Sequence, residues 1–233
     1  MSPQYPFEVF VSKEDFKFNA SHFVAYRNYR ERIHGHNYKV SVRLIGERIQ
    51  EDGYLLDFGD VKRAVRKLCK EMNEHFICPM LSDVIEIREF ELAELVNGNP
   101  NSNSNPNPNP NPHLRLLCED KTMFIFPSSD CLKLPISHAT TEELSVYLFV
   151  ETLKGLNVET LKARGIRLME VTVAEAEGQQ SVFRSAVDSG VDLLDKYIPK
   201  SSGSSSSHTR ASAERCQSFQ VGCASCSGVS FLP

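Results

Sequence analysis

Alternation of hydrophobic and polar residues dominates the first part of the chain. Phe7–Val11 and Phe16–Phe18 each alternate with period two, which is the spacing of a strand with one buried face, and the polar run Ser12–Asp15 separates them. The segment Tyr38–Leu44 alternates without interruption. These patterns predict one strand broken by a turn or bulge, and a second, antiparallel strand with one solvated face. A further strand, Tyr54–Leu56, is predicted to pair with the second strand as a hairpin.

Helical spacing replaces the alternation in two other segments. Hydrophobic residues recur at helical spacing after Asp57, which predicts a helix over residues 58–73 with Asp57 as its N-cap. Thr140 followed three residues later by Glu143 is a capping-box pattern, so a second helix is predicted to begin there. Cys69 lies on the hydrophobic stripe of the first helix, where a buried structural thiol is expected rather than a reactive one.

Two more strands are predicted after the second helix. Met169, Val171 and Val173 alternate with polar residues, and Ser181–Phe183 gives a short last strand. Glu175 has the same parity as the hydrophobic set, so it is expected to continue the inward face. The order of elements has too few strand–helix alternations for a parallel doubly wound sheet. It favours an α+β fold in which an antiparallel four-stranded sheet carries two helices on one face.

Residues 82–137 interrupt this pattern and are predicted to be an insertion. Asn and Pro dominate residues 97–112, which have no hydrophobic side chain beyond proline to bury, so a mobile loop is expected there. Met123–Phe126 and Leu132–Leu134 flank that segment and are hydrophobic enough to pack as small added strands. We therefore expect the insertion to belong to the surrounding domain rather than to mark a boundary.

Composition and charge narrow the class of protein. The chain has 233 residues, 41% of them hydrophobic, which is enough for one domain that we place at residues 1–198. Residues 199–233 are rich in Ser and are predicted to be a disordered tail. The net charge of −4 and the lack of a dense Lys/Arg run do not favour a nucleic-acid or membrane partner. Seven cysteines without a visible secretory signal predict reduced thiols in a cytoplasmic protein.

Three histidines lie within fifteen residues, where predicted strands begin or end. His22 follows the first strand, His34 and His36 enter the second, and the polar, aromatic residues 26–30 between them are predicted to form a loop. His34 and His36 project side by side because alternate residues of a strand share a face. The alternative is that His22 is a surface cap and the other two are a solvated pair. Three imidazoles leave one tetrahedral position open, so the pattern predicts catalytic zinc.

Two carboxylates are candidates for the general base that such zinc chemistry needs. Glu31 is nearest to the His34–His36 pair, although a salt bridge to Arg30 or Arg32 would explain it equally well. Glu175 would be an acid on the inward face of a hydrophobic strand, which is either neutralised by a partner or binds a ligand. Its two oxygens suit a bidentate pairing with the N–H/NH₂ edge of a heterocycle.

Taken together, these residues resemble the 6-pyruvoyl-tetrahydropterin synthase family. The resemblance covers about residues 6–190 outside the insertion and rests on four motifs, namely Phe18–His22, His34–Tyr38, Thr140–Glu142 and Glu175. It implies the tunnelling fold, a zinc ion on His22, His34 and His36, and a pterin ring held by Glu175 with help from Thr140, Thr141 and Glu142. It also implies a homohexamer of two stacked trimers, with active sites between subunits.

Two departures from the family pattern refine this expectation. The ordinary synthase has a catalytic cysteine six residues before the first histidine of the His-Gly-His motif, and that position is Asn28 here. Residues 24–34 contain no cysteine, and Glu31 resembles the glutamate that replaces the cysteine in the type III, apicomplexan-type members. That group converts 7,8-dihydroneopterin triphosphate to 6-hydroxymethyl-7,8-dihydropterin for folate synthesis, which is the reaction that the resemblance implies.

The second departure concerns a proton relay. The family has an Asp-His pair after the first helix, whereas this chain has Asn73-Glu74-His75. His75 could supply the imidazole with Glu74 as its acid partner, or it could be a cation at the end of the helix. Alternative functions are an ordinary 6-pyruvoyl-tetrahydropterin synthase, a carboxy-tetrahydropterin synthase, or a non-catalytic scaffold that binds zinc or pterin.

Overall fold

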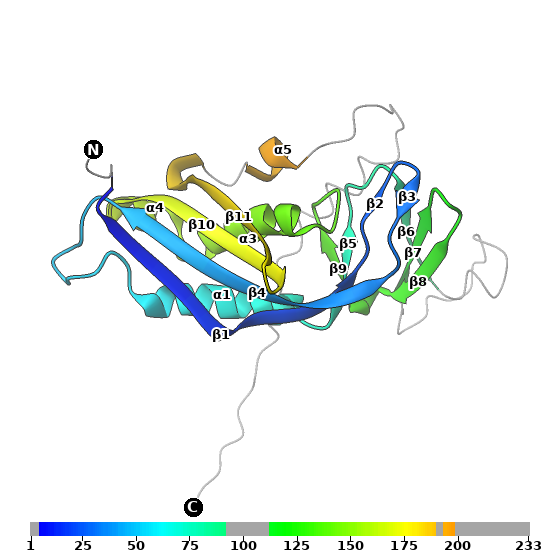
Figure 1. Cartoon of the computed structure of the whole chain (residues 1–233), viewed down its shortest axis with the longest axis horizontal. Coiled ribbons are helices and arrows are strands. Elements are labelled where there is room, and N and C mark those ends of the chain that lie inside the picture. Colours follow the sequence, from blue (N-terminus) through cyan, green and yellow to red (C-terminus); the bar gives the residue numbers. More distant parts are fainter. Residues whose placement is uncertain (1–4, 92–111, 190–192, 199–233) are drawn as a thin grey trace, which may run out of the picture. The chain divides into compact units, whose positions relative to one another are not determined.

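A six-stranded sheet forms the centre of the structure, which is a computed structural model that describes residues 5–91, 112–189 and 193–198 (Figure 1). The strand order is β11-β10-β4-β1-β5-β9, and the last two strands pair in parallel. The strands are β1 (Phe7–His22), β4 (His34–Gly46), β5 (His75–Pro79), β9 (Cys131–Leu134), β10 (Ile166–Ala176) and β11 (Gln179–Ala186).

The predicted antiparallel four-stranded sheet is confirmed as β11-β10-β4-β1, but the prediction of four strands is corrected to six. The run Phe76–Pro79 of β5 is buried at every position, so it lacks the polar–hydrophobic alternation that would have marked it as a strand. β1 shifts its register against β4 between Ser12 and Lys17, which confirms the predicted interruption.

The predicted hairpin partner of β4 is wrong, because Tyr54–Leu56 is not a strand. Leu55 and Leu56 are buried in the core, and the Arg164 guanidinium donates a hydrogen bond of 2.8 Å to the carbonyl of Leu55. β4 pairs instead with β1 on one side and β10 on the other.

Two long helices cover one face of the sheet. α1 (Phe58–Met72) packs on β1 and α3 (Thr141–Leu156) packs on β10, while the two helices contact each other (Figure 1). Asp57 caps α1 by accepting from the Gly59 amide, and Thr140 caps α3 by accepting from the Glu143 amide. Both predicted helix starts are confirmed. Two shorter helices, α4 (Val158–Ala163) and α5 (Leu193–Tyr197), follow α3 along the chain, and 3₁₀ turns occur at Ser128–Asp130 and Val187–Ser189.

The core lies between these helices and the sheet. Its largest fully buried side chains come from both layers, including Phe16, Phe18, Tyr38, Leu44 and Phe149. Cys69 of α1 is 2% exposed, and burial raises the pKa of its thiol to about 12. The expectation of a buried structural thiol at Cys69 is met.

The insertion contributes a separate antiparallel sheet of three strands, β6 (Ile85–Glu91), β7 (Pro112–Cys118) and β8 (Met123–Pro127). The predicted added strands are thus present as β8 and β9. Residues 92–111, which hold nearly all of the Asn-Pro segment, and the predicted tail at 199–233 lie outside the described residues. The expected loop at residues 26–30 is corrected to a hairpin of two short strands, β2 (Ala25–Tyr26) and β3 (Tyr29–Arg30).

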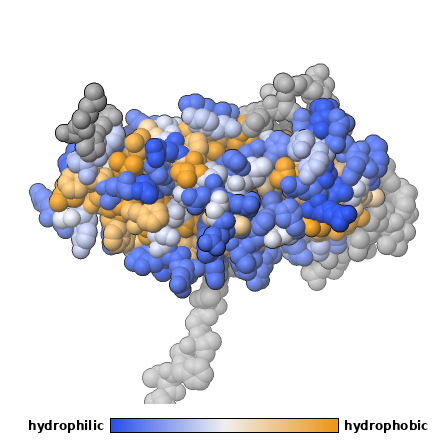
Figure 2. Space-filling model, in the orientation of Figure 1, coloured by the Kyte–Doolittle hydropathy of each residue, from blue (hydrophilic) through white to orange (hydrophobic). Residues whose placement is uncertain are grey.

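Hydrophobic and hydrophilic residues are interspersed on the face seen in Figure 2. Phe7 and Phe10 of β1 and Val182 of β11 are among the exposed hydrophobic residues. Within the described ranges, no helix is both long and hydrophobic enough to cross a membrane.

Candidate metal centre and active site

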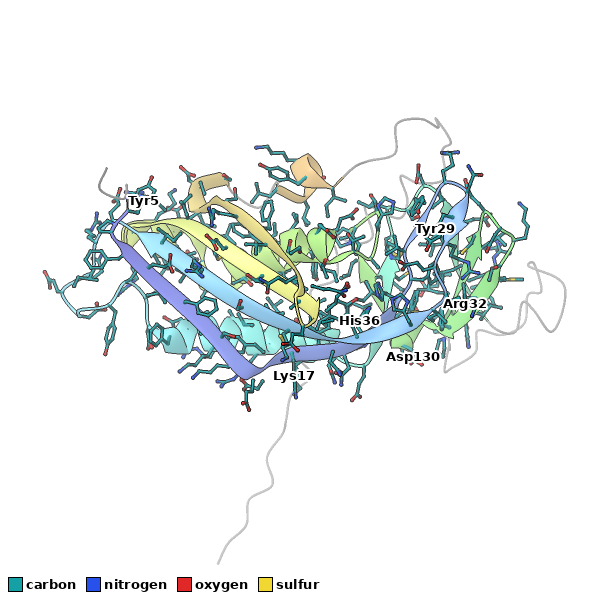
Figure 3. The ribbon with its side chains drawn as sticks, in the orientation of Figure 1. Tyr5, Lys17, Tyr29, Arg32, His36 and Asp130 are labelled. Carbon is teal, nitrogen blue, oxygen red and sulfur yellow. The ribbon has the colours of Figure 1, made fainter. Side chains whose placement is uncertain are left out.

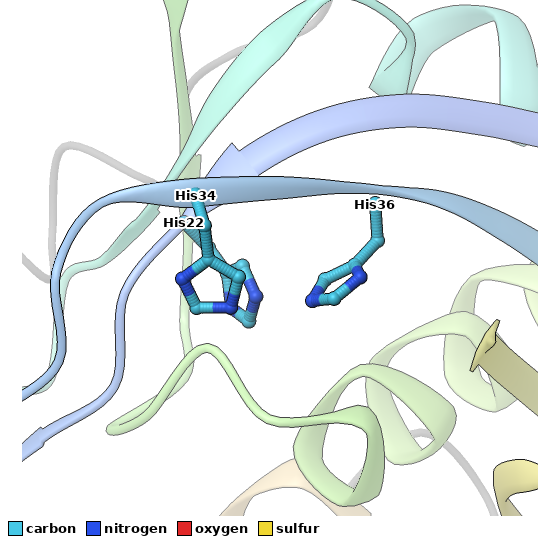
Figure 4. A group of neighbouring side chains, drawn as sticks. All are labelled: His22, His34 and His36. Atoms are coloured by element: carbon cyan, nitrogen blue, oxygen red, sulfur yellow. The ribbon is translucent and has the colours of Figure 1, made fainter.

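Three imidazoles converge where β1 ends and β4 begins. His22 pairs with His34 across the two strands, and His36 follows on the same face of β4, so all three rings lie on one side of the ribbon (Figure 4). One ligand atom from each ring lies within 4.8 Å of the others. Gly35 is in close contact with β1, since a Cβ there would lie 3.1 Å from the Ala20 carbonyl oxygen. The structure therefore brings together the three predicted metal ligands.

The hydrogen bonds of two of these rings leave the correct nitrogen available for a metal. Nδ1 of His22 donates to the carbonyl of Ala139 over 2.7 Å, and Nδ1 of His34 donates to the carbonyl of Arg32 over 2.8 Å. A carbonyl only accepts, so each Nδ1 carries the proton and each Nε2 keeps its lone pair. Nε2 of His22 is buried without a partner among the described residues, which is an orphaned acceptor that a metal would satisfy. The donor set fits zinc.

Burial favours the neutral form of the His22 imidazole. His22 is only 3% exposed, and this burial lowers the pKa of its ring. The nearby His34 and His36 lower the pKa further. The hydrogen bond to Ala139 and the charge of Glu31 act in the opposite direction but are outweighed. A metal binds neutral imidazole, so the lowered pKa favours a metal ligand.

Glu31 lies close enough to the histidines for its charge to act on His22. Its carboxylate accepts a hydrogen bond of 2.9 Å from the Val24 amide, and its own amide donates to the Val24 carbonyl over 2.9 Å. Arg30 does not take the predicted alternative role of ion-pair partner: its guanidinium binds the carbonyl of Glu31 over 2.7 Å and the carboxylate of Asp120 over 3.0 Å. Backbone contacts with Val24 therefore hold the Glu31 carboxylate, whose charge acts on His22.

Glu175 lies near His36 of the cluster, close to the end of β10. One of its carboxylate oxygens is 3.9 Å from Nε2 of His36, and its side chain is 27% exposed. The pairing of β10 with β11 shifts register between Ala174 and Ala176, so Glu175 sits at an irregularity of the strand. Such irregularities often redirect a side chain towards a functional site.

The loop before α3 faces the three histidine rings (Figure 4). Thr140, Thr141 and Glu142 follow this loop at the start of the helix. Ser181 of β11 donates to the carbonyl of Thr141 over 2.6 Å, and Ser181 pairs with Val173, two residues before Glu175. The start of α3 and the end of β10 are thus joined beside the histidines.

Glu143 was predicted to complete a capping box, but its carboxylate bonds to the turn that precedes the N-cap residue Thr140. It accepts hydrogen bonds from the Ser137 amide over 2.6 Å, from the His138 amide over 3.1 Å and from Nδ1 of His138 over 3.0 Å. The bond to Glu143 raises the pKa of His138, against a smaller effect of burial. Glu143 thereby fixes the turn that ends at Ala139, whose carbonyl orients His22.

His75 begins β5 rather than ending the helix, so it is not a cation in the last turn of α1. Its Nδ1 is buried and has no hydrogen-bond partner among the described residues, so the expected pairing with Glu74 is not formed at this nitrogen. His75 and His36 both line a cavity of about 510 Å³, together with Ser21 and Asp130 (Figure 3, His36 and Asp130 labelled). The cavity has the size of an ordinary small-molecule site.

Tyr38 is a residue of this region that sequence reasoning did not assign to the site. Its hydroxyl is buried and without a partner among the described residues, and its ring stacks on Phe18 and meets His22 and His36 edge-on. Burial raises the pKa of the phenol, and the charges of Glu175 and Glu31 raise it further. Its place on the hydrophobic face of β4 was visible in the alternation, but the unpaired hydroxyl was not.

Comparisons with known proteins agree with this geometry. A family model described as 6-pyruvoyl tetrahydropterin synthase matches residues 11–186. A crystal structure of 6-pyruvoyl tetrahydropterin synthase from Plasmodium vivax is 37% identical with a TM-score of 0.65, covering 77% of this chain and 97% of that chain. The Plasmodium falciparum protein is 35% identical with a TM-score of 0.65, over 77% of this chain and 97% of that chain.

Two further Plasmodium vivax structures are described as catalytic residue mutants, in which a glutamate is replaced by alanine or by cysteine. A relative from Methanocaldococcus jannaschii carries the provisional name 6-carboxy-5,6,7,8-tetrahydropterin synthase. It is 27% identical over 172 residues, which are 74% of this chain and 91% of that protein. The family model spans most of the chain, and the three histidines, Glu31 and Glu175 fall within it. The chain therefore belongs to the 6-pyruvoyl tetrahydropterin synthase family and is a pterin enzyme of that family.

Proposed function

We propose that this protein is a zinc-dependent lyase that converts 7,8-dihydroneopterin triphosphate to 6-hydroxymethyl-7,8-dihydropterin, for folate synthesis. The observation that carries the proposal is the Glu31 carboxylate, held beside three convergent imidazoles in a segment without cysteine. The Plasmodium vivax relative, whose described variants replace a catalytic glutamate, supports a glutamate in this role.

The cysteines of the described residues support the same conclusion. Cys69, Cys78, Cys118 and Cys131 are free and buried, and burial raises the pKa of each thiol, to about 12 for Cys69 and Cys78 and to about 11 for Cys131. A nucleophilic cysteine needs a thiolate, and the raised pKa of each buried thiol disfavours that form. A carboxylate is therefore the better candidate for the base.

The proposed reaction is a cleavage of the substrate side chain. Zinc bound to His22, His34 and His36 would supply a Lewis acid that lowers the pKa of a substrate hydroxyl. Glu31 would remove the proton from the hydroxyl on the second side-chain carbon. The bond between the first and second carbons then breaks, its electrons pass to the pterin ring, and the second carbon becomes the aldehyde of a two-carbon triphosphate. Protonation of the first carbon completes 6-hydroxymethyl-7,8-dihydropterin.

The remaining candidate residues would have two roles, binding the pterin ring and delivering the final proton. Glu175 would hold the guanidine-like edge of the pterin, and its position 3.9 Å from His36 would bring the ring next to the metal ligands. Thr140, Thr141 and Glu142 would assist from the start of α3. His75 lines the same cavity as His36, so we propose that it delivers the final proton.

Product analysis tests the reaction. The zinc-loaded protein is incubated with 7,8-dihydroneopterin triphosphate and the pterin products are identified by mass spectrometry. We expect mainly 6-hydroxymethyl-7,8-dihydropterin. A main product of 6-pyruvoyl-tetrahydropterin would show the ordinary synthase reaction, and 6-carboxy-tetrahydropterin would match the name of the archaeal relative. Tight binding without turnover would indicate a scaffold.

Replacing Glu31 tests the base directly. Glu31→Gln keeps the shape of the side chain but cannot accept the proton, so the turnover rate should fall by about 10²–10⁴, the usual contribution of a general base. Zinc content should not change, since Glu31 is not in the ligand cluster. Glu177→Gln, at the exposed turn two residues beyond Glu175, is the matched control and should keep full turnover. Wild-type turnover in the Glu31→Gln protein would remove Glu31 from the mechanism.

The expected assembly also remains a proposal. A homohexamer of two stacked trimers would cover exposed hydrophobic residues of the sheet, such as Phe10 (53% exposed) and Val182 (50% exposed), the latter on the edge strand β11. A mass of six chains measured by light scattering is the expected result, and a stable monomer would contradict it.

A further inference from the structure

Arg30 connects the inserted sheet to the segment that carries Glu31. Its guanidinium donates to the carboxylate of Asp120 over 3.0 Å and to the hydroxyl of Thr122 over 3.1 Å, both in the turn between β7 and β8. The same guanidinium donates to the carbonyl of Glu31 over 2.7 Å. One side chain thus spans from the insertion to the backbone of the candidate base.

Aromatic packing holds this guanidinium in place. Its central carbon lies 5.4 Å from the ring centre of Phe124 on β8 and 5.9 Å from that of Phe23, which follows β1. The two rings are themselves 5.1 Å apart, and Phe23 is 1% exposed. The Arg30 side chain is only 17% exposed, whereas that of Asp120 is 47% exposed, so the guanidinium is held mainly by its packing and by several contacts together rather than by the ion pair alone.

A second contact fastens the tip of the same hairpin. The amide of Asn28, in the turn between β2 and β3, donates to the carboxylate of Glu119 over 2.9 Å. Arg27 lies 3.8 Å from Glu119 and 3.8 Å from Asp83, but these pairs are largely exposed. The hairpin is therefore attached to the β7–β8 turn at its tip by Glu119 and at its base by Arg30.

Glu31 comes directly after this hairpin and has few other constraints. Its amide and one carboxylate oxygen bond to Val24, on the opposite side of the hairpin base. Both Val24 and Glu31 therefore move if the hairpin moves. A general base must stay within hydrogen-bond reach of the proton that it removes, and a shift of about 1 Å can cost on the order of 10² in rate.

We propose that the inserted β6–β8 sheet is a working part of the active site, because its β7–β8 turn fixes the backbone that carries the Glu31 carboxylate through the positioning residue Arg30. This inference rests on the proposed role of Glu31 as the base. In this proposal the insertion does more than add stability to the fold, because it sets the orientation of a catalytic group.

The experiment removes the anchor while leaving Arg30 and Glu31 intact. Asp120→Asn combined with Thr122→Val deletes the charge and the hydroxyl that hold the guanidinium, while Asn keeps the oxygen that accepts from the Thr122 amide. The control is Glu86→Gln, which breaks the Glu86–Arg115 ion pair between β6 and β7 of the same sheet. Turnover, KM, zinc content and amide exchange of the segment 24–31 are measured for each protein.

The anchor variant should lose about tenfold in kcat, with KM within about twofold of wild type and zinc content unchanged. Amide exchange at Val24 and Glu31 should become faster, whereas Glu86→Gln should match wild type in every measurement. In a Glu31→Gln background, the anchor variant should cause no further loss, because the group that it positions is already gone.

Three outcomes would overturn the inference. Unchanged exchange at Val24 and Glu31 would show that Arg30 does not fix the segment, whatever the activity of Glu31→Gln. Equal losses of kcat in the wild-type and Glu31→Gln backgrounds would show that the anchor acts through another group. Full turnover of Glu31→Gln alone would refute the proposed role of Glu31 and the catalytic role of the anchor, even if the hairpin loosens.

Discussion

Two histidines near Ala139, His22 and His138, have pKa values that the protein shifts in opposite directions. His22 is buried and its pKa is lowered, which favours the neutral ring that a metal binds. His138 is bonded to the Glu143 carboxylate and its pKa is raised, so the ring favours the charged form. Burial dominates in the first case and a charged partner in the second.

Replacing His34 tests the metal site at the level of single residues. His34→Ala should remove most of the stoichiometric zinc, since two imidazoles bind zinc far less well than three. Metal content measured by elemental analysis after dialysis gives the result. His75→Gln, which changes a histidine of the adjoining cavity outside the cluster, is the control and should keep its zinc. Unchanged zinc in His34→Ala would refute the ligand assignment.

Stability as a function of pH tests the His138–Glu143 pair. The folded pKa of His138 is raised above its ordinary value of 6.5, so the pair stabilises the protein fully below pH 6.5 and loses this contribution as the pH rises through the folded pKa. Compared with metal-free wild type, His138→Gln should lower Tm near pH 6 by about 2–4 °C for each kcal/mol lost from the free energy of unfolding. Near pH 9 the decrease in Tm should be much smaller. Thermal unfolding followed by circular dichroism measures the difference, and a pH-independent difference would contradict the assignment.

At the scale of elements, the N-terminus of α3 controls the orientation of a metal ligand from outside the cluster. Glu143 holds the turn from Ser137 to Ala139, and Ala139 fixes the tautomer of His22. Groups that orient a metal-binding histidine usually contribute a measurable part of the metal affinity.

Glu143→Ala should therefore weaken zinc binding by about tenfold, because the amides of Ser137 and His138 both lose the carboxylate oxygen that accepts from them. Glu142→Ala is the matched control, since Glu142 lies on the same turn but its carboxylate contacts Thr141 rather than the loop. Competition with a chromophoric chelator measures both affinities. Equal affinities in the two variants would show that the loop does not depend on Glu143.

The sequence predicted those elements whose local pattern reflects their final environment. The alternation of Tyr38–Leu44 and the cap at Asp57 correctly indicated β4 and α1, because one face of each is solvated. The run Phe76–Pro79 gave no alternation, since β5 is buried on both faces and pairs in parallel. Local patterns cannot show such long-range pairing.

The same distinction applies to the candidate site. His22, His34 and His36 were predictable because they lie within fifteen residues on neighbouring strands. The roles of Arg30 and Glu143 were not, since the Arg30 contacts join residues about 90 positions apart and Glu143 acts through a turn that precedes its own helix. Tyr38 was placed on the correct face, but only the structure reveals its unpaired hydroxyl.

At the scale of the whole described unit, two hydrophobic cores meet at the end of β1. The first lies between the sheet and the helices, and the second joins Phe23 and Phe76 to side chains of the inserted sheet, including Leu114, Leu116 and Phe124. The inserted sheet is therefore built into the fold by its own core rather than attached as a surface loop.

Shortening the insertion at its Asn-Pro segment should leave this second core intact. β6 and β7 pair from Ile85–Cys118 to Glu91–Pro112, so a deletion of residues 99–110 preserves every pair of the hairpin. A shorter loop costs less entropy to close, so turnover and Tm should stay at or slightly above the wild-type values. A deletion that continues through Leu114 removes a buried residue and should lower Tm strongly, which makes it the control. Loss of turnover in the shorter deletion would assign the segment a direct role.

The position of the three histidines also has a consequence for the order of folding. All three ligands come from the hairpin of β1 and β4, whereas the Ala139 carbonyl that orients His22 lies 117 residues further along the chain. During synthesis the nascent chain exposes a complete set of metal-binding side chains before α3 has been made. We therefore expect the metal to bind partly folded chains, in which His22 is not yet oriented by the docking of α3. Because zinc also binds these partly folded chains, it should stabilise the native protein less than its affinity alone would indicate.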